Sequence, residues 1–104
     1  GVDADDHKRA SDCLEKGRRY YNSKRYDRAA DLFRKAVRYD GHYALAQYYL
    51  GLALYKTEDT DAAVKSWRRV IELEPDSDIA AQANRTIAKV QGKMFRIIDR
   101  LERA

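Results

Sequence analysis

The chain has 104 residues, of which 37% are charged and 44% are apolar, and its formal net charge is +4. This length and composition predict one soluble, folded domain with a modest core and argue against a disordered chain. No run of eighteen apolar residues occurs, so we expect no membrane-spanning helix. No charged and then apolar leader begins the chain, so we expect no signal peptide, and the localisation stays unknown.

The first seven residues, GVDADDH, are small and acidic and show no apolar period. We therefore expect residues 1–7 to form a flexible N-terminus. Side chains that can bind metals are present there, namely Asp3, Asp5, Asp6 and His7. Flexible carboxylates without a preformed cage rarely hold a metal ion, so we predict no metal site.

Residues 10–43 form the first of two similar units. The apolar spacing predicts one helix from about Lys8 to Asn22 and another from about Tyr26 to Tyr39, with a turn at Ser23–Arg25. This unit is basic, since residues 8–38 contain eleven Lys or Arg against four Asp or Glu.

Residues 44–77 form the second unit, in which two helical patterns flank a polar turn at Thr57–Asp59. Gly51 lies within the first of these helices, Trp67 lies within the second, and Pro75 closes the unit. A small residue facing a large one is what two antiparallel helices need for close packing. The second unit is acidic, with four Lys or Arg against eight Asp or Glu in residues 40–78.

The two units repeat each other at an offset of 34 residues. The identical pairs are Ala10/Ala44, Gly17/Gly51, Tyr21/Tyr55, Asp27/Asp61, Ala29/Ala63 and Arg34/Arg68. This pattern resembles the tetratricopeptide repeat (TPR), which is 34 residues long and has small, aromatic and proline residues at set positions. The positions that carry the resemblance in the second unit are Leu50, Gly51, Leu54, Ala63, Trp67, Val70 and Pro75.

The resemblance implies an all-α fold, an α-α superhelix of two helical hairpins and a long C-terminal helix. We expect a single TPR-like domain over residues 8–104. Its parts would be repeat one at 10–43, repeat two at 44–77 and a capping helix at 78–104. The resemblance also implies a non-catalytic scaffold for protein–protein interaction.

The last segment carries apolar residues at spacings of three and four, at Ile79, Ala83, Ile87, Val90, Met94, Ile97, Ile98 and Leu101. This stripe crosses Gly92 without a break, which favours one long helix. A turn at residues 91–93 is the alternative, so residues 93–104 could also form a separate helix. A continuous helix would extend past the hairpins and expose apolar side chains that a second copy could cover. The residues for such self-association are Met94, Ile97, Ile98 and Leu101.

In the TPR family, the concave face uses five positions of the first helix of each repeat. Carried onto this chain, they predict a peptide-binding groove of Leu14, Arg18, Tyr21, Asn22, Leu45, Tyr48, Leu52, Tyr55, Lys56, Ile79, Gln82, Thr86 and Lys89. Tyrosines offer stiff contact area with a polar tip, which is typical of binding surfaces. The flanking cations predict a protein or peptide partner with both apolar and acidic side chains.

Three alternatives remain open at this point. Some of the tyrosines could pack against the last helix or a neighbouring chain instead of a ligand. The domain could be a structural self-association unit, a homodimer formed through its last helix or through complementary charged faces. Finally, basic and aromatic residues alternate in the first unit as in single-strand nucleic-acid binders, although the acidic second unit would repel phosphates.

Catalysis is not expected from this sequence. Its two histidines, His7 and His42, have no suitably spaced Cys or Ser partner, and neither zinc-ligand spacing nor a glycine-rich phosphate loop is present. Cys13 is the single cysteine, which rules out an internal disulfide. We therefore predict neither enzymatic activity nor a cofactor.

Overall fold

The structure, a computed structural model, describes residues 3–104. Within this range the chain forms five α-helices and no strand. They are α1 (Ala4–Asn22), α2 (Tyr26–Tyr39), α3 (Ala44–Lys56), α4 (Thr60–Leu73) and α5 (Asp78–Arg103). The expected all-α fold with two hairpins and a long last helix is thereby confirmed. No helix in this part of the chain combines the length and the apolar composition that crossing a membrane requires.

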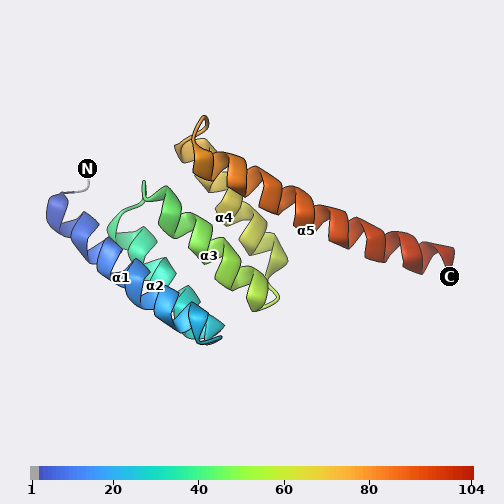
Figure 1. Cartoon of the computed structure of the whole chain (residues 1–104), viewed down its shortest axis with the longest axis horizontal. Helices are drawn as coiled ribbons and strands as arrows, with labels where there is room; N and C mark the ends of the chain where they lie inside the picture. Colours follow the sequence, from blue (N-terminus) through green and yellow to red (C-terminus); the bar gives the residue numbers. More distant parts are fainter. Residues whose placement is uncertain (1–2) are drawn as a thin grey trace.

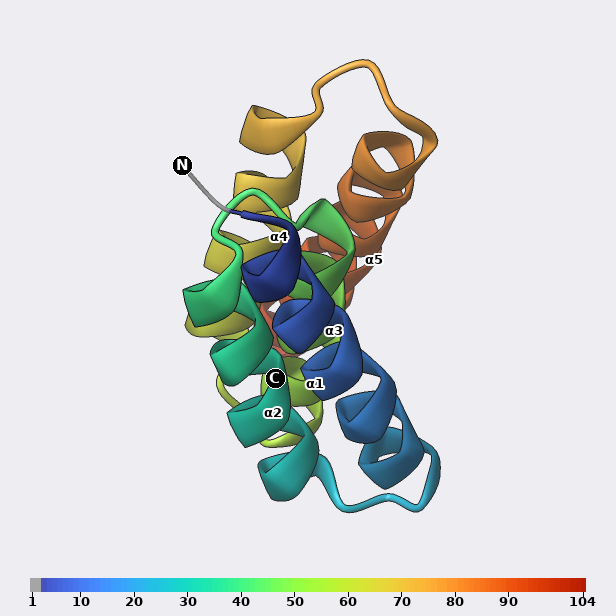
Figure 2. The same cartoon turned by 90° about the vertical axis from the view of Figure 1, so that its left-hand side faces the viewer.

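The helices pack mainly against their neighbours in the sequence. α1 packs on α2 and α3 packs on α4, while α2 also contacts α3 and α4 also contacts α5 (Figure 1). The view in Figure 2 shows the outcome: α1, α3 and α5 lie in one row, and α2 and α4 lie in the other. The first helix of each unit therefore contributes to the same face of the molecule.

Each hairpin is held by an aromatic residue that packs directly on a glycine. Phe33 and Trp67 have no exposed surface, and they face Gly17 and Gly51 on the preceding helices. A Cβ atom at Gly17 would lie 2.6 Å from Cε1 of Phe33, and one at Gly51 would lie 2.6 Å from Cδ1 of Trp67. Only glycine permits this approach, which explains why both repeats carry it.

The two hairpin turns share one geometry. Lys24 and Glu58, which are 34 residues apart, have φ angles of 62° and 67° in the left-handed region. After each of them the chain closes the turn in the same way, since Arg25 N–H donates to Tyr20 O and Asp59 N–H donates to Leu54 O, both at 2.9 Å. The repeat thus extends from the helices to the backbone of the turns.

α1 begins one turn earlier than the sequence predicted. Residues 1–2 of the expected flexible terminus lie outside the described residues, but the helix begins at Ala4 instead of about Lys8. The Asp3 carboxylate accepts the Asp6 backbone N–H at 2.7 Å and caps the helix. Two acidic residues in the first turn also stabilise the helix, because their negative charge lies at the positive end of the helix dipole.

A second contact holds this early turn to the body. His7 Nδ1 lies 2.7 Å from Asp40 Oδ2, and the His7 ring centroid lies 4.8 Å from that of Tyr43. Asp40 also accepts the His42 backbone N–H at 3.0 Å. The hydrogen bond from His7 lowers the pKa of the Asp40 carboxyl below its usual value, although burial opposes the shift.

This lowered pKa predicts a contribution to stability that disappears in acid. As the pH falls, the unfolded chain takes up a proton on Asp40 first, at a pH of about 4, while the folded chain resists protonation. We expect wild type to be more stable than Asp40→Asn above about pH 5, and the difference to shrink as the pH falls through the folded pKa. Urea unfolding across this pH range measures the difference. A gap between the two proteins that is independent of pH would contradict the prediction, and His7→Ala should reduce the pH dependence.

α5 is a single helix that continues through Gly92. The Ser77 hydroxyl caps it by accepting the Ala80 N–H at 3.1 Å. Its 26 residues span about 39 Å, whereas the 14 residues of α4 span about 21 Å. The last turns of α5 therefore project beyond the two hairpins, as Figure 1 shows.

Candidate functional site

The predicted groove residues come from α1, α3 and α5, the three helices that lie in one row (Figure 2). Leu14 is buried in the core, so it does not belong to the exposed face. We call the remaining residues the tyrosine face: Arg18, Tyr21, Asn22, Leu45, Tyr48, Leu52, Tyr55, Lys56, Ile79, Gln82, Thr86 and Lys89. Its tyrosines and aliphatic side chains are half-buried, while its charged residues are exposed.

Several tyrosine rings gather where α1 meets α3. The ring centroids of Tyr21 and Tyr26 lie 5.1 Å apart in an edge-on arrangement, and those of Tyr48 and Tyr49 lie 6.2 Å apart. Burial raises the pKa of the Tyr21 hydroxyl, and the nearby hydroxyls of the other three raise it further. Tyr21 therefore stays neutral at physiological pH and can donate a hydrogen bond to a ligand.

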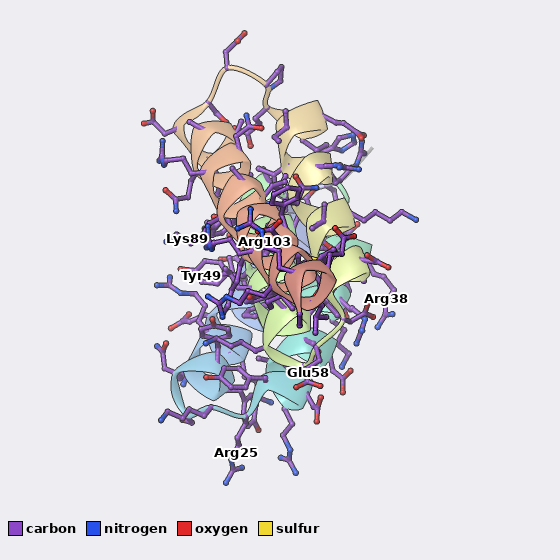
Figure 3. The ribbon with its side chains drawn as sticks, turned by 90° about the vertical axis from the view of Figure 1, so that its right-hand side faces the viewer. Arg25, Arg38, Tyr49, Glu58, Lys89 and Arg103 are labelled. Carbon is purple, nitrogen blue, oxygen red and sulfur yellow. The ribbon has the colours of Figure 1, made fainter. Side chains whose placement is uncertain are left out.

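Cations lie over and beside these rings. The guanidinium carbon of Arg18 lies 5.0 Å from the centroid of the Tyr49 ring, and Lys56 Nζ lies 5.7 Å from that of Tyr26. Figure 3 shows Lys89 on the same side of the molecule as Tyr49. None of the three cations pairs with a carboxylate within residues 3–104. Their positive charge is thus available to a ligand.

Tyr48 also has a structural role, because it ties α3 to α5. Its hydroxyl lies 3.0 Å from Oγ1 of Thr86 and accepts a hydrogen bond from Gln82 Nε2 at 3.4 Å. Its backbone carbonyl accepts the Trp67 indole N–H at 3.2 Å. For this residue, the alternative of packing against the last helix therefore holds. Tyr55 instead packs within the second hairpin, since its ring centroid lies 6.2 Å from that of Trp67 on α4.

Two aromatic residues beside the face were not among the predicted groove residues. Tyr49 packs between Arg18 and Phe33, whose ring centroid is 5.6 Å away, and Tyr26 contacts the face from α2. The repeat pattern assigns groove positions to first helices only, so it passes over Tyr26 on α2. Tyr49 does lie on a first helix, α3, but not at one of the five groove positions of that helix. The alternation of basic and aromatic residues in the first unit is the signal that could have pointed to Tyr26.

The tyrosine face is an open surface, and cavities lie to the side of it. One cavity of about 570 Å³ lies between the two hairpin turns and is lined in part by Lys56 of the tyrosine face. Another of about 340 Å³ lies along the outer side of α1. Among the described residues, no group of three or more His, Cys, Asp or Glu side chains is placed to hold a metal ion. The arrangement can offer hydrogen bonds, ring surfaces and positive charge.

A comparison with known protein families agrees with this geometry. The family model described as tetratricopeptide repeat matches residues 14–78, which is more than half of the chain. The match begins within α1 and ends at the first residue of α5, so it covers both hairpins. A comparison with curated proteins found no match.

Proposed function

The chain belongs to the tetratricopeptide repeat family, whose repeats are generally non-catalytic interaction modules, and on this premise we propose a ligand for its tyrosine face. The ligand is a peptide or helical segment of another protein. It carries apolar side chains that pack on the tyrosines and acidic side chains that meet the cations.

One observation carries this proposal: exposed cations without carboxylate partners stand among half-buried tyrosines. Arg18, Lys56 and Lys89 come from three different helices and are free of ion pairs among residues 3–104. Tyrosines give contact area at a low cost in side-chain entropy, because only two torsions become fixed. Acidic and apolar groups alternating along a ligand would complement both features.

The dimensions of the face support an extended or helical peptide over a small molecule. Three helices in a row at a spacing of about 9 Å span nearly 20 Å, which corresponds to roughly six extended residues. A surface that is open along this length suits a chain that crosses it.

The test reverses charge on the face and compares the result with an equal change elsewhere. We expect the triple variant Arg18→Glu, Lys56→Glu, Lys89→Glu to bind library peptides that carry both apolar and acidic residues at least roughly tenfold more weakly than wild type. The control reverses three exposed cations of α2 and α4: Lys35→Glu, Arg38→Glu, Lys65→Glu. Figure 3 shows Arg38 on the side opposite Tyr49.

Fluorescence anisotropy with labelled peptides measures the affinities, and circular dichroism verifies that both variants fold. These surface changes are cleaner than Tyr48→Ala, because Tyr48 also joins α3 to α5. Equal loss in the two triple variants would refute the proposal, since it would show attraction by total charge only. A library without binders but tight binding to a single-stranded oligonucleotide would also refute it, in favour of nucleic acid.

A further inference from the structure

The end of α5 exposes more large apolar side chains than any other described element. Its exposed large side chains are Met94, Phe95, Ile97, Ile98 and Leu101. Upstream on the same helix, Ala83, Ile87 and Val90 are buried against the hairpins. Apart from Phe95, the buried and the exposed positions follow one spacing of three and four residues, so they lie on one side of the helix.

The packing surface of α5 therefore continues past the point where its partners α3 and α4 end (Figure 1). We call Met94, Ile97, Ile98 and Leu101 the α5 stripe; Phe95 flanks it. The five side chains are 43% to 72% exposed, which leaves roughly 500 Å² of apolar surface uncovered if each offers about 150–200 Å². A single patch of that size is at the upper end for a monomer and often marks an interface.

We propose that a second copy of this chain covers the α5 stripe, with the two α5 ends antiparallel in a closed, two-fold symmetric dimer. In this arrangement Met94 of each copy faces Leu101 of the other, and Ile97 faces Ile98. A two-fold interface requires a surface that complements itself, and a stripe with large aliphatic residues at both ends and in the middle meets that requirement.

The apolar area reaches what such a dimer needs when Phe95 is covered together with the α5 stripe. Two copies would then bury roughly 1,000 Å² of apolar side-chain surface, which is about the lower limit for a specific interface, whereas the four stripe residues alone would give roughly 750 Å². Interfaces of this size form weak or moderate complexes, so we expect a dissociation constant in roughly the micromolar range.

Charge decides between the antiparallel dimer and other pairings. The end of α5 has a net positive charge, because Lys93, Arg96, Arg100 and Arg103 outnumber Asp99 and Glu102, so a parallel pair would bring like net charges together. Arg103 Nε also lies 3.2 Å from Asp99 Oδ2 of the same helix.

The turn before α4 and the start of α4 are acidic, with Glu58, Asp59 and Asp61. Asp61 lines a cavity together with Gln91 and Met94, and Lys65 and Arg68 line the same cavity one and two turns further along α4.

In the antiparallel pair, Arg103 of the second copy lies level with Gly92 and therefore beside this acidic start. Figure 3 shows the acidic Glu58 on the turn before α4 and Arg103 near the free end of α5. At both ends of the interface, Arg103 of one copy, which also pairs with Asp99 of its own helix, thus lies near acidic side chains of the other copy. Insertion of the α5 end into the tyrosine face of another copy is disfavoured, because Arg18, Lys56 and Lys89 would repel it.

Molar mass as a function of concentration tests the proposal. We expect sedimentation equilibrium on the full chain to show monomers that become dimers between about 5 and 500 μM. Ile98→Asp should weaken association at least about 100-fold, because it buries a charge in the interface. The α5 stripe is not part of the core, so helical content should not change. Ala88→Asp, on an exposed position of the same helix, should dimerise as wild type does.

A wild-type protein that stays monomeric throughout this range overturns the proposal, whatever other protein covers the stripe. A dimer that survives Ile98→Asp, or assembly that continues beyond dimers, overturns it as well.

Disulfide formation tests the orientation, in a Cys13→Ser background. In the antiparallel pair, the two copies of residue 98 are about 1.5 Å apart along the helix axis, whereas the two copies of residue 101 are about 10 Å apart. Ile98→Cys should therefore form a cross-linked dimer on oxidation, and Leu101→Cys should not, since a disulfide needs Cα atoms within about 7 Å. Efficient cross-linking of Leu101→Cys would indicate a parallel pair and refute the antiparallel one.

Discussion

Trp67→Ala should lower the free energy of unfolding by about 3–5 kcal/mol. Trp67 has no exposed surface, fills the space between α3 and α4, and donates its indole N–H to the Tyr48 carbonyl at 3.2 Å. Truncation leaves a cavity and removes a partner from a part-buried carbonyl, and both effects destabilise the folded state. Urea unfolding followed by circular dichroism measures the loss, which is a large share of the roughly 5–15 kcal/mol typical of a domain.

Trp67→Phe is the matched control for this substitution. It keeps an aromatic ring on Gly51 and removes the indole nitrogen, so it should cost clearly less than Trp67→Ala. A loss below about 1 kcal/mol for Trp67→Ala would show that the second hairpin does not depend on this side chain.

Gly51→Leu should also destabilise the protein, by about 3 kcal/mol or more. Even the first added carbon, Cβ, would lie 2.6 Å from Cδ1 of Trp67, which is well inside van der Waals contact. Relief requires the helices of the second hairpin to move apart, because the neighbouring side chain is fully buried. Gly51→Ala should lower the free energy of unfolding by a smaller amount, and urea unfolding measures both losses.

Gly92→Ala provides the contrast for Gly51→Ala. A Cβ at Gly92 meets only an Arg96 nitrogen, at 3.7 Å, so alanine should raise stability by about 0.5–1 kcal/mol through its helix propensity. A destabilised Gly92→Ala would contradict this explanation. In addition, Gly51→Ala should cost less in a Trp67→Ala background, because the clash then has no partner. If the losses in stability of the two single variants add up to that of the double variant, the glycine and the tryptophan act independently.

Much of the fold could be predicted from the sequence because helix pairs have local signals. The 34-residue repeat places Gly17 and Gly51 opposite Phe33 and Trp67, and the structure has these contacts. The apolar spacing through Gly92 favoured one long α5, which the structure contains. The start of α1 was predicted four residues too late, because the local cap at Asp3 was not used and because the His7–Asp40 contact joins residues 33 positions apart.

The candidate site was less accessible to prediction. Repeat positions predicted which residues line the face, but Leu14 is buried in the core, and the bond to Thr86 gives Tyr48 a structural role. Both outcomes depend on the distance between neighbouring helices. Cation–ring contacts such as that of Arg18 with Tyr49 also depend on the distance between helices. The position of a residue within its repeat does not specify this distance.

By itself the sequence determined the helices, their pairing into hairpins and the projection of α5, because period, glycine placement and turn residues act over a few turns of chain. The tertiary structure decided which tyrosines are committed to packing, which cations are free of carboxylates and where the apolar surface of α5 loses its partners. Those properties arise when helices of fixed but different lengths are placed side by side. A side chain is then buried or exposed according to whether a neighbouring helix reaches its level.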